Sequence, residues 1–148
     1  MIRLHRLFGV GVLAASVGVL SGCGGAAESP VSPTSAPVNV TGTWAGGPVI
    51  WRLTQSGDTV TGTGEFNNDT NAVFGTYSGS GPVAGTISGS TLSFTVACPT
   101  LTVPNCREDT TGTATVGATT ISGRYNQVDT CGGQVVLTLN GNFTMSKQ

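Results

Sequence analysis

The sequence predicts an all-β domain, an antiparallel up-and-down β-barrel of about eight strands. Two observations predict this class. The chain has 23 Gly among 148 residues and only 9% charged residues. From Val40 onward, short segments of alternating apolar and polar residues are separated by Gly-containing turns. No segment after the N-terminal 22 residues has helical periodicity. A two-sheet β-sandwich built from the same strands is the alternative.

The N-terminal segment is expected to direct export. Arg3 and Arg6 precede an apolar run at residues 7–20, which has the length of a signal-peptide core rather than of a membrane span. The string Leu20-Ser21-Gly22-Cys23 that follows resembles the bacterial lipobox. The resemblance implies cleavage before Cys23, acylation of that cysteine and stable anchoring in a membrane. It also implies an outer-membrane location if the cell has one, because Asp does not follow Cys23, and otherwise the cell surface.

Three segments follow from this interpretation. Residues 1–22 are the signal peptide, and residues 23–40 are a lipidated tether whose small residues and prolines bury too little surface to fold. Residues 41–148 are the barrel. Its strands are expected at residues 41–45, 48–55, 59–66, 80–88, 91–97, 109–116, 119–127 and 134–146.

Three hairpins predict the strand register. With Gly57-Asp58 as a two-residue turn, apolar residues face apolar or glycine residues on both strands. These pairs are Leu53–Gly62, Trp51–Gly64 and Val49–Phe66, with Thr54–Thr61 and Arg52–Thr63 on the other face. A turn at Gly89-Ser90 gives Ile87–Leu92, Gly85–Phe94 and Val83–Val96. A turn near Gly117-Ala118 gives Ala114–Ile121, Gly112–Gly123 and Thr110–Tyr125.

The predicted inner face mixes glycines with bulky side chains. The bulky residues, which are the candidate ligand-binding residues, are Trp51, Phe66, Phe94, Ile121, Tyr125 and Phe143. Two interpretations remain open. Either the glycines make room for their bulky neighbours and the core is filled, or they leave a cavity for one small hydrophobic molecule. A filled core would indicate a structural or protein-interaction role in the envelope.

The first expected strand carries a short motif. Thr41-Gly42-Thr43-Trp44 contains Gly-x-Trp, and Lys147 follows the last expected strand. This pattern resembles the calycin group of lipocalins, fatty-acid-binding proteins and avidins, and in particular the small bacterial lipocalin-like lipoproteins. The resemblance implies that Trp44 packs at one end of the barrel under Lys147, with Gly42 beside them.

Three cysteines remain after Cys23. Cys98 ends one expected strand, Cys106 lies before the next, and Cys131 lies in the loop before the last strand. The hairpin register places Cys106 opposite Asp129, near Cys131, whereas Cys98 and Cys106 face each other across a loop. Which two of Cys98, Cys106 and Cys131 are bridged remains open, with Cys106 favoured as the shared member. Export to an oxidising compartment favours a disulfide between two of these cysteines over a metal site.

Several function classes are excluded or disfavoured. A formal net charge of −1 excludes a polyanion-binding protein, so no nucleic-acid partner is expected. The single histidine, His5, lies in the expected signal peptide, so the exported chain has no His-dependent catalytic arrangement. The Asn67–Asn71 segment lacks the Gly and the terminal Glu of a calcium loop. We therefore expect no enzyme, no metal and no cofactor.

Overall fold

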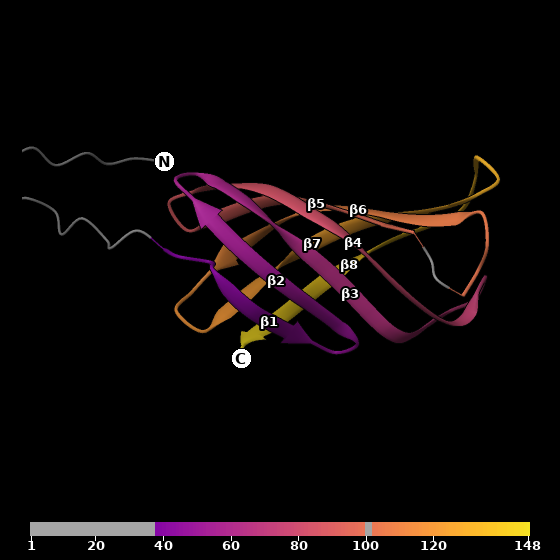
Figure 1. Ribbon diagram of the computed structural model, residues 1–148, viewed down its shortest axis with the longest axis horizontal. Coiled ribbons are helices and arrows are strands. Elements are labelled where there is room, and N and C mark those ends of the chain that lie inside the picture. Colours follow the sequence, from indigo (N-terminus) through magenta and orange to yellow (C-terminus); the bar gives the residue numbers. More distant parts are fainter. Residues whose placement is uncertain (1–37, 100–101) are drawn as a thin grey trace, which may run out of the picture. The chain divides into compact units, whose positions relative to one another are not determined.

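The eight strands of the domain close into one antiparallel barrel in chain order (Figure 1). In this computed structural model, residues 38–99 and 102–148 are described. The strands are β1 (Gly42–Gly46), β2 (Val49–Ser56), β3 (Thr59–Asn71), β4 (Gly75–Ser88), β5 (Thr91–Pro99), β6 (Cys106–Val116), β7 (Thr120–Cys131) and β8 (Gln134–Lys147). The predicted barrel is confirmed, and the sandwich alternative is wrong. The expected signal peptide and lipid-bearing Cys23 lie outside the described residues.

The first two hairpins have the predicted registers. Trp51 pairs with Gly64 and Val49 with Phe66 across β2 and β3. Gly85 pairs with Phe94 across β4 and β5. In both hairpins, a shift by one residue would turn the apolar side chains to solvent, which is why the alternation identifies the register.

The third predicted register is wrong by two residues. Val116 pairs with Ile121 and Gly112 with Tyr125, because a longer turn joins β6 to β7. In this turn the Gly117 amide donates to the Thr120 carbonyl at 2.7 Å. A two-residue shift leaves every side chain on its predicted face, so the alternation alone does not exclude it.

An apolar floor fills the barrel near the three hairpin turns. Its buried side chains are Leu53, Val60, Ile87, Leu92, Val116, Ile121 and Met145. Trp44 is fully buried beside them, and Lys147 Nζ lies 5.1 Å from its ring centroid. A Cβ at Gly42 would lie 3.0 Å from Lys147 Cε, so glycine leaves room for the lysine stem over the indole.

The barrel includes residues that precede its predicted start at residue 41. Val40 is fully buried, and its carbonyl accepts a 2.7 Å hydrogen bond from Trp44 Nε1. The Val40 amide donates to Gln55 Oε1 at 2.9 Å, and Val38 packs against the core. Residues 38–40 therefore belong to the barrel, because two valines there bury apolar surface that the linker composition obscured.

Several strands extend further than predicted at the other end of the barrel. β3 continues to Asn71, β4 begins at Gly75, β6 begins at Cys106 and β7 continues to Cys131. A β-bulge interrupts the β3–β4 pairing between Phe66 and Asp69. The composition of these extensions, rich in Asn, Asp and Thr, predicts loops. They form strands because the backbone N–H and C=O groups of each extension pair with those of a neighbouring strand.

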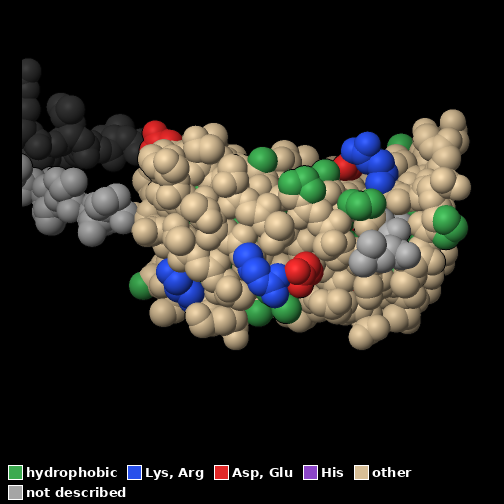
Figure 2. Space-filling view, in the orientation of Figure 1, with side chains coloured by type: hydrophobic (Ala, Val, Ile, Leu, Met, Phe, Trp, Pro, Cys, Tyr) green, Lys and Arg blue, Asp and Glu red, His purple; other side chains and the backbone are tan. Residues whose placement is uncertain are grey.

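The outer surface is mostly uncharged and polar. Outward positions on the strands are dominated by Thr, Ser and Asn, and few charged or hydrophobic side chains appear on the face in Figure 2. On the outer surface, an ion pair joins Arg52 and Glu65 at 2.6 Å. Across residues 38–99 and 102–148, no helix has the length and hydropathy required to span a bilayer.

Candidate ligand-binding cavity

A cavity of about 380 Å³ occupies the barrel between the apolar floor and the long strand ends. It is lined from every strand except β4, so it lies on the barrel axis rather than on the outer wall. This volume falls in the range of small-molecule pockets. The barrel therefore contains internal space, as the cavity interpretation predicts. The glycines also make room for bulky neighbours, as the packing interpretation predicts, because an added Cβ at Gly64 would come within 3.2 Å of Trp51.

Three aromatic rings form the apolar wall of the cavity. Trp51 and Phe94 have ring centroids 4.9 Å apart, and Phe143 lies 5.6 Å from Trp51 and 5.5 Å from Phe94. The edge-to-face arrangement stabilises the cluster and holds the rings in place. Gly64 lies against Trp51, where an added Cβ would come within 3.2 Å of the indole.

Five of the six candidate ligand-binding residues line the cavity. They are Trp51, Phe66, Phe94, Tyr125 and Phe143. Ile121 is the exception. It is fully buried and absent from the cavity lining, because it belongs to the apolar floor. The sequence pattern identifies which residues point inward, but not how far along the axis each one lies.

The polar end of the cavity is built around Glu108, which the sequence did not suggest as a site residue. Glu108 lies on the inner face of β6, is only 8% exposed and lines the cavity. Tyr77 Oη donates to Glu108 Oε2 at 3.1 Å, and Thr110 Oγ1 lies 3.4 Å from Oε1. A predicted strand that begins at Cys106, as β6 does, would identify Glu108 as an inward residue, because Glu108, Thr110 and Gly112 alternate with outward residues.

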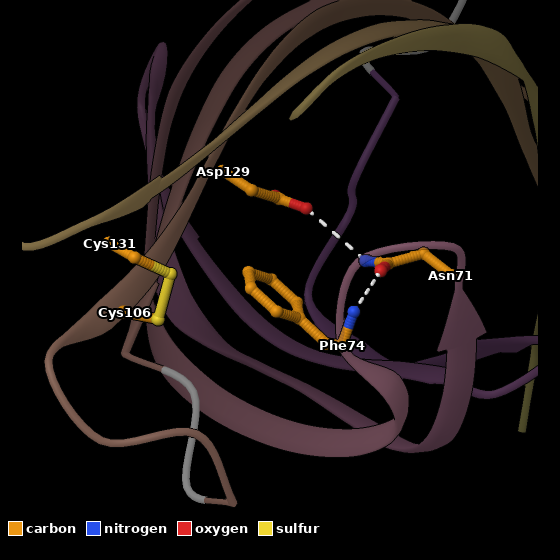
Figure 3. Close-up of a disulfide and its surroundings, with 5 residues drawn as sticks. All are labelled: Asn71, Phe74, Cys106, Asp129 and Cys131. Carbon is orange, nitrogen blue, oxygen red and sulfur yellow. Dashed lines mark hydrogen bonds between the residues drawn. A yellow bond between two sulfur atoms is a disulfide. The ribbon is translucent and has the colours of Figure 1, made fainter. Parts of the chain in front are cut away.

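A second polar group lies on β7. Gln127 is 8% exposed, lines the cavity and donates from Nε2 to Asp129 Oδ1 at 3.0 Å. Asp129 is fully buried and also accepts from Asn71 Nδ2 at 3.3 Å, as Figure 3 shows. Because Asp129 is an acceptor, it fixes the Gln127 amide with its nitrogen toward the carboxylate. The Gln127 oxygen is left without a hydrogen-bond partner within the described part of the chain.

The bulge in β3 turns two polar residues, Asp69 and Asn71, toward the barrel interior. Asn68 adopts a left-handed conformation with φ of 52°, which Asn tolerates better than most residues. The register shift places Asp69 opposite Tyr77, on the inner face. Asn71 accepts from the Phe74 amide at 2.8 Å while it donates to Asp129, so it links the β3–β4 turn to β7 (Figure 3). A bulge re-aims side chains in this way.

Burial controls the ionisation of the polar end. Desolvation raises the pKa of Glu108 to about 7, the Tyr77 hydrogen bond opposes this rise, and the charges of Asp129 and Asp69 add to it. Desolvation also raises the pKa of Asp129, against its hydrogen bond from Gln127. The Cys98 thiol, at the cavity wall, has its pKa raised to about 12 by burial and by Glu108 and Asp109. The cavity therefore has a carboxyl group that titrates near neutral pH.

The cavity reaches the surface beside the β1–β8 seam. Its lining includes Gly47 and Pro48 of the β1–β2 turn and Asn142 and Thr144 of the outer face of β8. β1 is only five residues long and pairs with β8 at two positions. The long edge of β8 beyond this pairing has no β1 partner, which leaves a lateral opening.

The cysteines resolve the open pairing. Cys106 and Cys131 are directly opposite in the β6–β7 register and form a disulfide. The prediction that Cys106 faces Asp129 is wrong, since the register differs by two residues; Asp129 faces Glu108 instead. Cys98 is the free cysteine of the described chain, and it is buried. The disulfide ties β6 to β7 at the polar end (Figure 3).

Comparisons with solved structures identify the fold. A shwanavidin–biotin complex aligns with a TM-score of 0.49 and 17% identity, over 74% of this chain and 97% of that chain. A low-affinity shwanavidin mutant aligns with a TM-score of 0.50 and 18% identity, over 76% and 98%. The chain shares the shwanavidin fold. Apo shwanavidin aligns with a TM-score of 0.47 and 19% identity, over 74% and 97%.

The similarity to shwanavidin concerns the fold. It agrees with the predicted antiparallel barrel of eight strands. No protein-family model matches the chain, and no curated protein is significantly similar to it. No group of three or more His, Cys, Asp or Glu in the described ranges has the arrangement to hold a metal ion. What the cavity binds must therefore be argued from its own residues.

Proposed function

We propose that this protein binds one small molecule in the barrel cavity and does not act as an enzyme. The single observation that carries this proposal is the cavity of about 380 Å³ with an apolar wall of Trp51, Phe94 and Phe143 facing a polar end at Glu108 and Gln127. An apolar wall with few convergent polar groups is typical of ligand pockets. The ligand is therefore amphipathic.

The proposal is tested by blocking the cavity. Thr110 lines the cavity, whereas its neighbour Thr111 is exposed on the outer face of β6. We expect Thr110→Phe to abolish binding and Thr111→Phe to leave it unchanged, because only the first ring enters the cavity. Binding is measured as fluorescence enhancement of N-phenyl-1-naphthylamine and by native mass spectrometry with biotin, the ligand of one shwanavidin structure.

Two outcomes would contradict the proposal. One is that neither N-phenyl-1-naphthylamine nor biotin binds to the wild-type domain. The other is equal binding by Thr110→Phe and Thr111→Phe, which would place the probe on the outer surface. Circular dichroism of both variants controls for folding, since both introduce the same side chain at adjacent positions.

We also propose that the barrel is a lipoprotein anchored through Cys23, at the outer membrane or the cell surface. The basic start, the apolar run and the lipobox-like string at residues 20–23 support this location. Replacing Cys23 with Ser is expected to move the protein from the membrane fraction to the soluble fraction. Unchanged membrane fractionation of the variant would contradict the anchor without affecting the cavity.

A further inference from the structure

We propose that the ligand is an organic cation, with an apolar body against the aromatic wall and a protonated nitrogen head at Glu108 and Gln127. This inference rests on the proposed function and specifies the chemical class of its ligand. It follows from the hydrogen-bond acceptors at the polar end, from the distribution of charge around the cavity, and from the shape of the aromatic wall.

The polar end presents acceptors rather than donors. Glu108 contributes a carboxylate that is more than nine-tenths buried, and Gln127 contributes an amide oxygen with no hydrogen-bond partner among the described residues. Two donor groups at this end are already used. Tyr77 Oη donates to Glu108, and Gln127 Nε2 donates to Asp129. A head group that fits this end must therefore supply N–H or O–H donors.

The charge at this end is not compensated by protein cations. No Lys, Arg or His lines the cavity, whereas Asp69 and Glu108 do; Glu65 also lines it, but its carboxylate is paired with Arg52. Two other basic residues have partners away from the cavity, Arg107 with Asp109 and Lys147 with Trp44. Arg124 is exposed on the outer face of β7. An anionic head group would meet Glu108 and Asp69 without a counter-charge, whereas a cation would supply one.

The aromatic wall favours the same class. The rings of Trp51, Phe94 and Phe143 enclose the body of a ligand whose head reaches Glu108, since all four side chains line one cavity. Electron-rich ring faces do not attract an anion. The wall therefore accommodates the apolar body of a cationic ligand and adds no attraction for an anionic one.

The test compares three ligands with the same ring system. We expect 2-naphthylmethylamine, which is cationic, to bind about tenfold or more tightly than 2-naphthylmethanol, because a hydrogen bond to a charged group is stronger than one between neutral groups. We expect 2-naphthoate, the anion, to bind more weakly than the alcohol. Affinities are measured by isothermal titration calorimetry on the domain with its disulfide intact.

A matched pair of variants locates the preference. Glu108→Gln keeps an acceptor for Tyr77 but removes the charge, and it is expected to abolish the advantage of the amine over the alcohol. Asp58→Asn removes one acidic charge at the exposed β2–β3 turn, at the far end of the barrel, and is expected to retain the advantage. Asp58→Asn should also bind the alcohol as the wild type does.

The pH profile adds a readout that packing alone would not change. The groups that face Glu108 are Asp69 on β3, Tyr77 on β4, Cys98 on β5, Thr110 on β6 and Asp129 on β7. Since the pKa of Glu108 is about 7, affinity for the amine is expected to increase from pH 5 to pH 8, with proton release on binding. Affinity for the alcohol should not increase in the same way.

The outcomes separate this inference from the proposed function. Equal affinity for amine and alcohol, or tighter binding of the naphthoate, would overturn the cationic ligand while a binding cavity remains. An amine preference that persists in Glu108→Gln would also overturn it. Failure of all three ligands to bind, with no binding of N-phenyl-1-naphthylamine, would overturn both.

Discussion

Replacing Trp51 with Ala is expected to lower the free energy of unfolding by about 4 kcal/mol, as removal of a buried aromatic side chain from a packed core does. Trp51 is 5% exposed and contacts two other rings of the wall, so the surrounding side chains have little freedom to close the space. Urea denaturation monitored by circular dichroism measures the change.

Val136→Ala serves as the control for this variant. Val136 is 39% exposed on β8, so its truncation is expected to change the unfolding free energy by less than about 0.5 kcal/mol. A loss of less than about 1 kcal/mol for Trp51→Ala would mean that the indole is not packed as described. The apolar wall of the cavity would then need to be redrawn.

Raising the pH from 4.5 to 8 is expected to lower the unfolding free energy by about 3 kcal/mol through Glu108 alone. The pKa of Glu108 is raised from 4.5 to about 7 in the folded chain, so the folded state holds this proton more tightly than the unfolded chain. This contribution is fully present below about pH 4.5 and is lost as the pH rises through 7. The raised pKa of Asp129 acts in the same direction.

Urea denaturation at a series of pH values checks this expectation in the ligand-free domain. Glu108→Gln is expected to flatten most of the profile, because glutamine does not titrate and still accepts from Tyr77. Asp58→Asn, at an exposed turn, is expected to follow the wild type. Parallel profiles for wild type and Glu108→Gln would show that Glu108 is not the titrating group.

The sequence predicts the apolar half of the cavity better than the polar half. Trp51 and Phe94 are identified because each alternates with polar residues and pairs with glycine in a short hairpin. Local alternation contains that information. The alternation does not indicate how far along the barrel axis a residue lies. Ile121 therefore cannot be distinguished from a cavity residue without the three-dimensional structure.

The polar half depends on features that one sequence does not reveal. Tyr77 and Asp129 lie outside the predicted strands, because Asn, Asp and Gly near them suggest loops. Asp69 and Asn71 face inward only because of the bulge at Asn68, which the alternation pattern does not encode. Glu108 lies one residue before the predicted strand at 109–116, whereas β6 begins at Cys106.

The two-residue pairing between β1 and β8 has a kinetic consequence. The first strand pairs with the last only at Trp44–Lys147 and Ala45–Ser146, with one further backbone hydrogen bond from Gln148 to Thr43, whereas β7 and β8 pair along twelve residues. Local opening follows the weakest set of backbone hydrogen bonds. Amide hydrogens along this join should exchange with solvent well before those of β7. Because the cavity mouth lies beside the same join, the rate at which a bound molecule leaves should follow the rate of that opening.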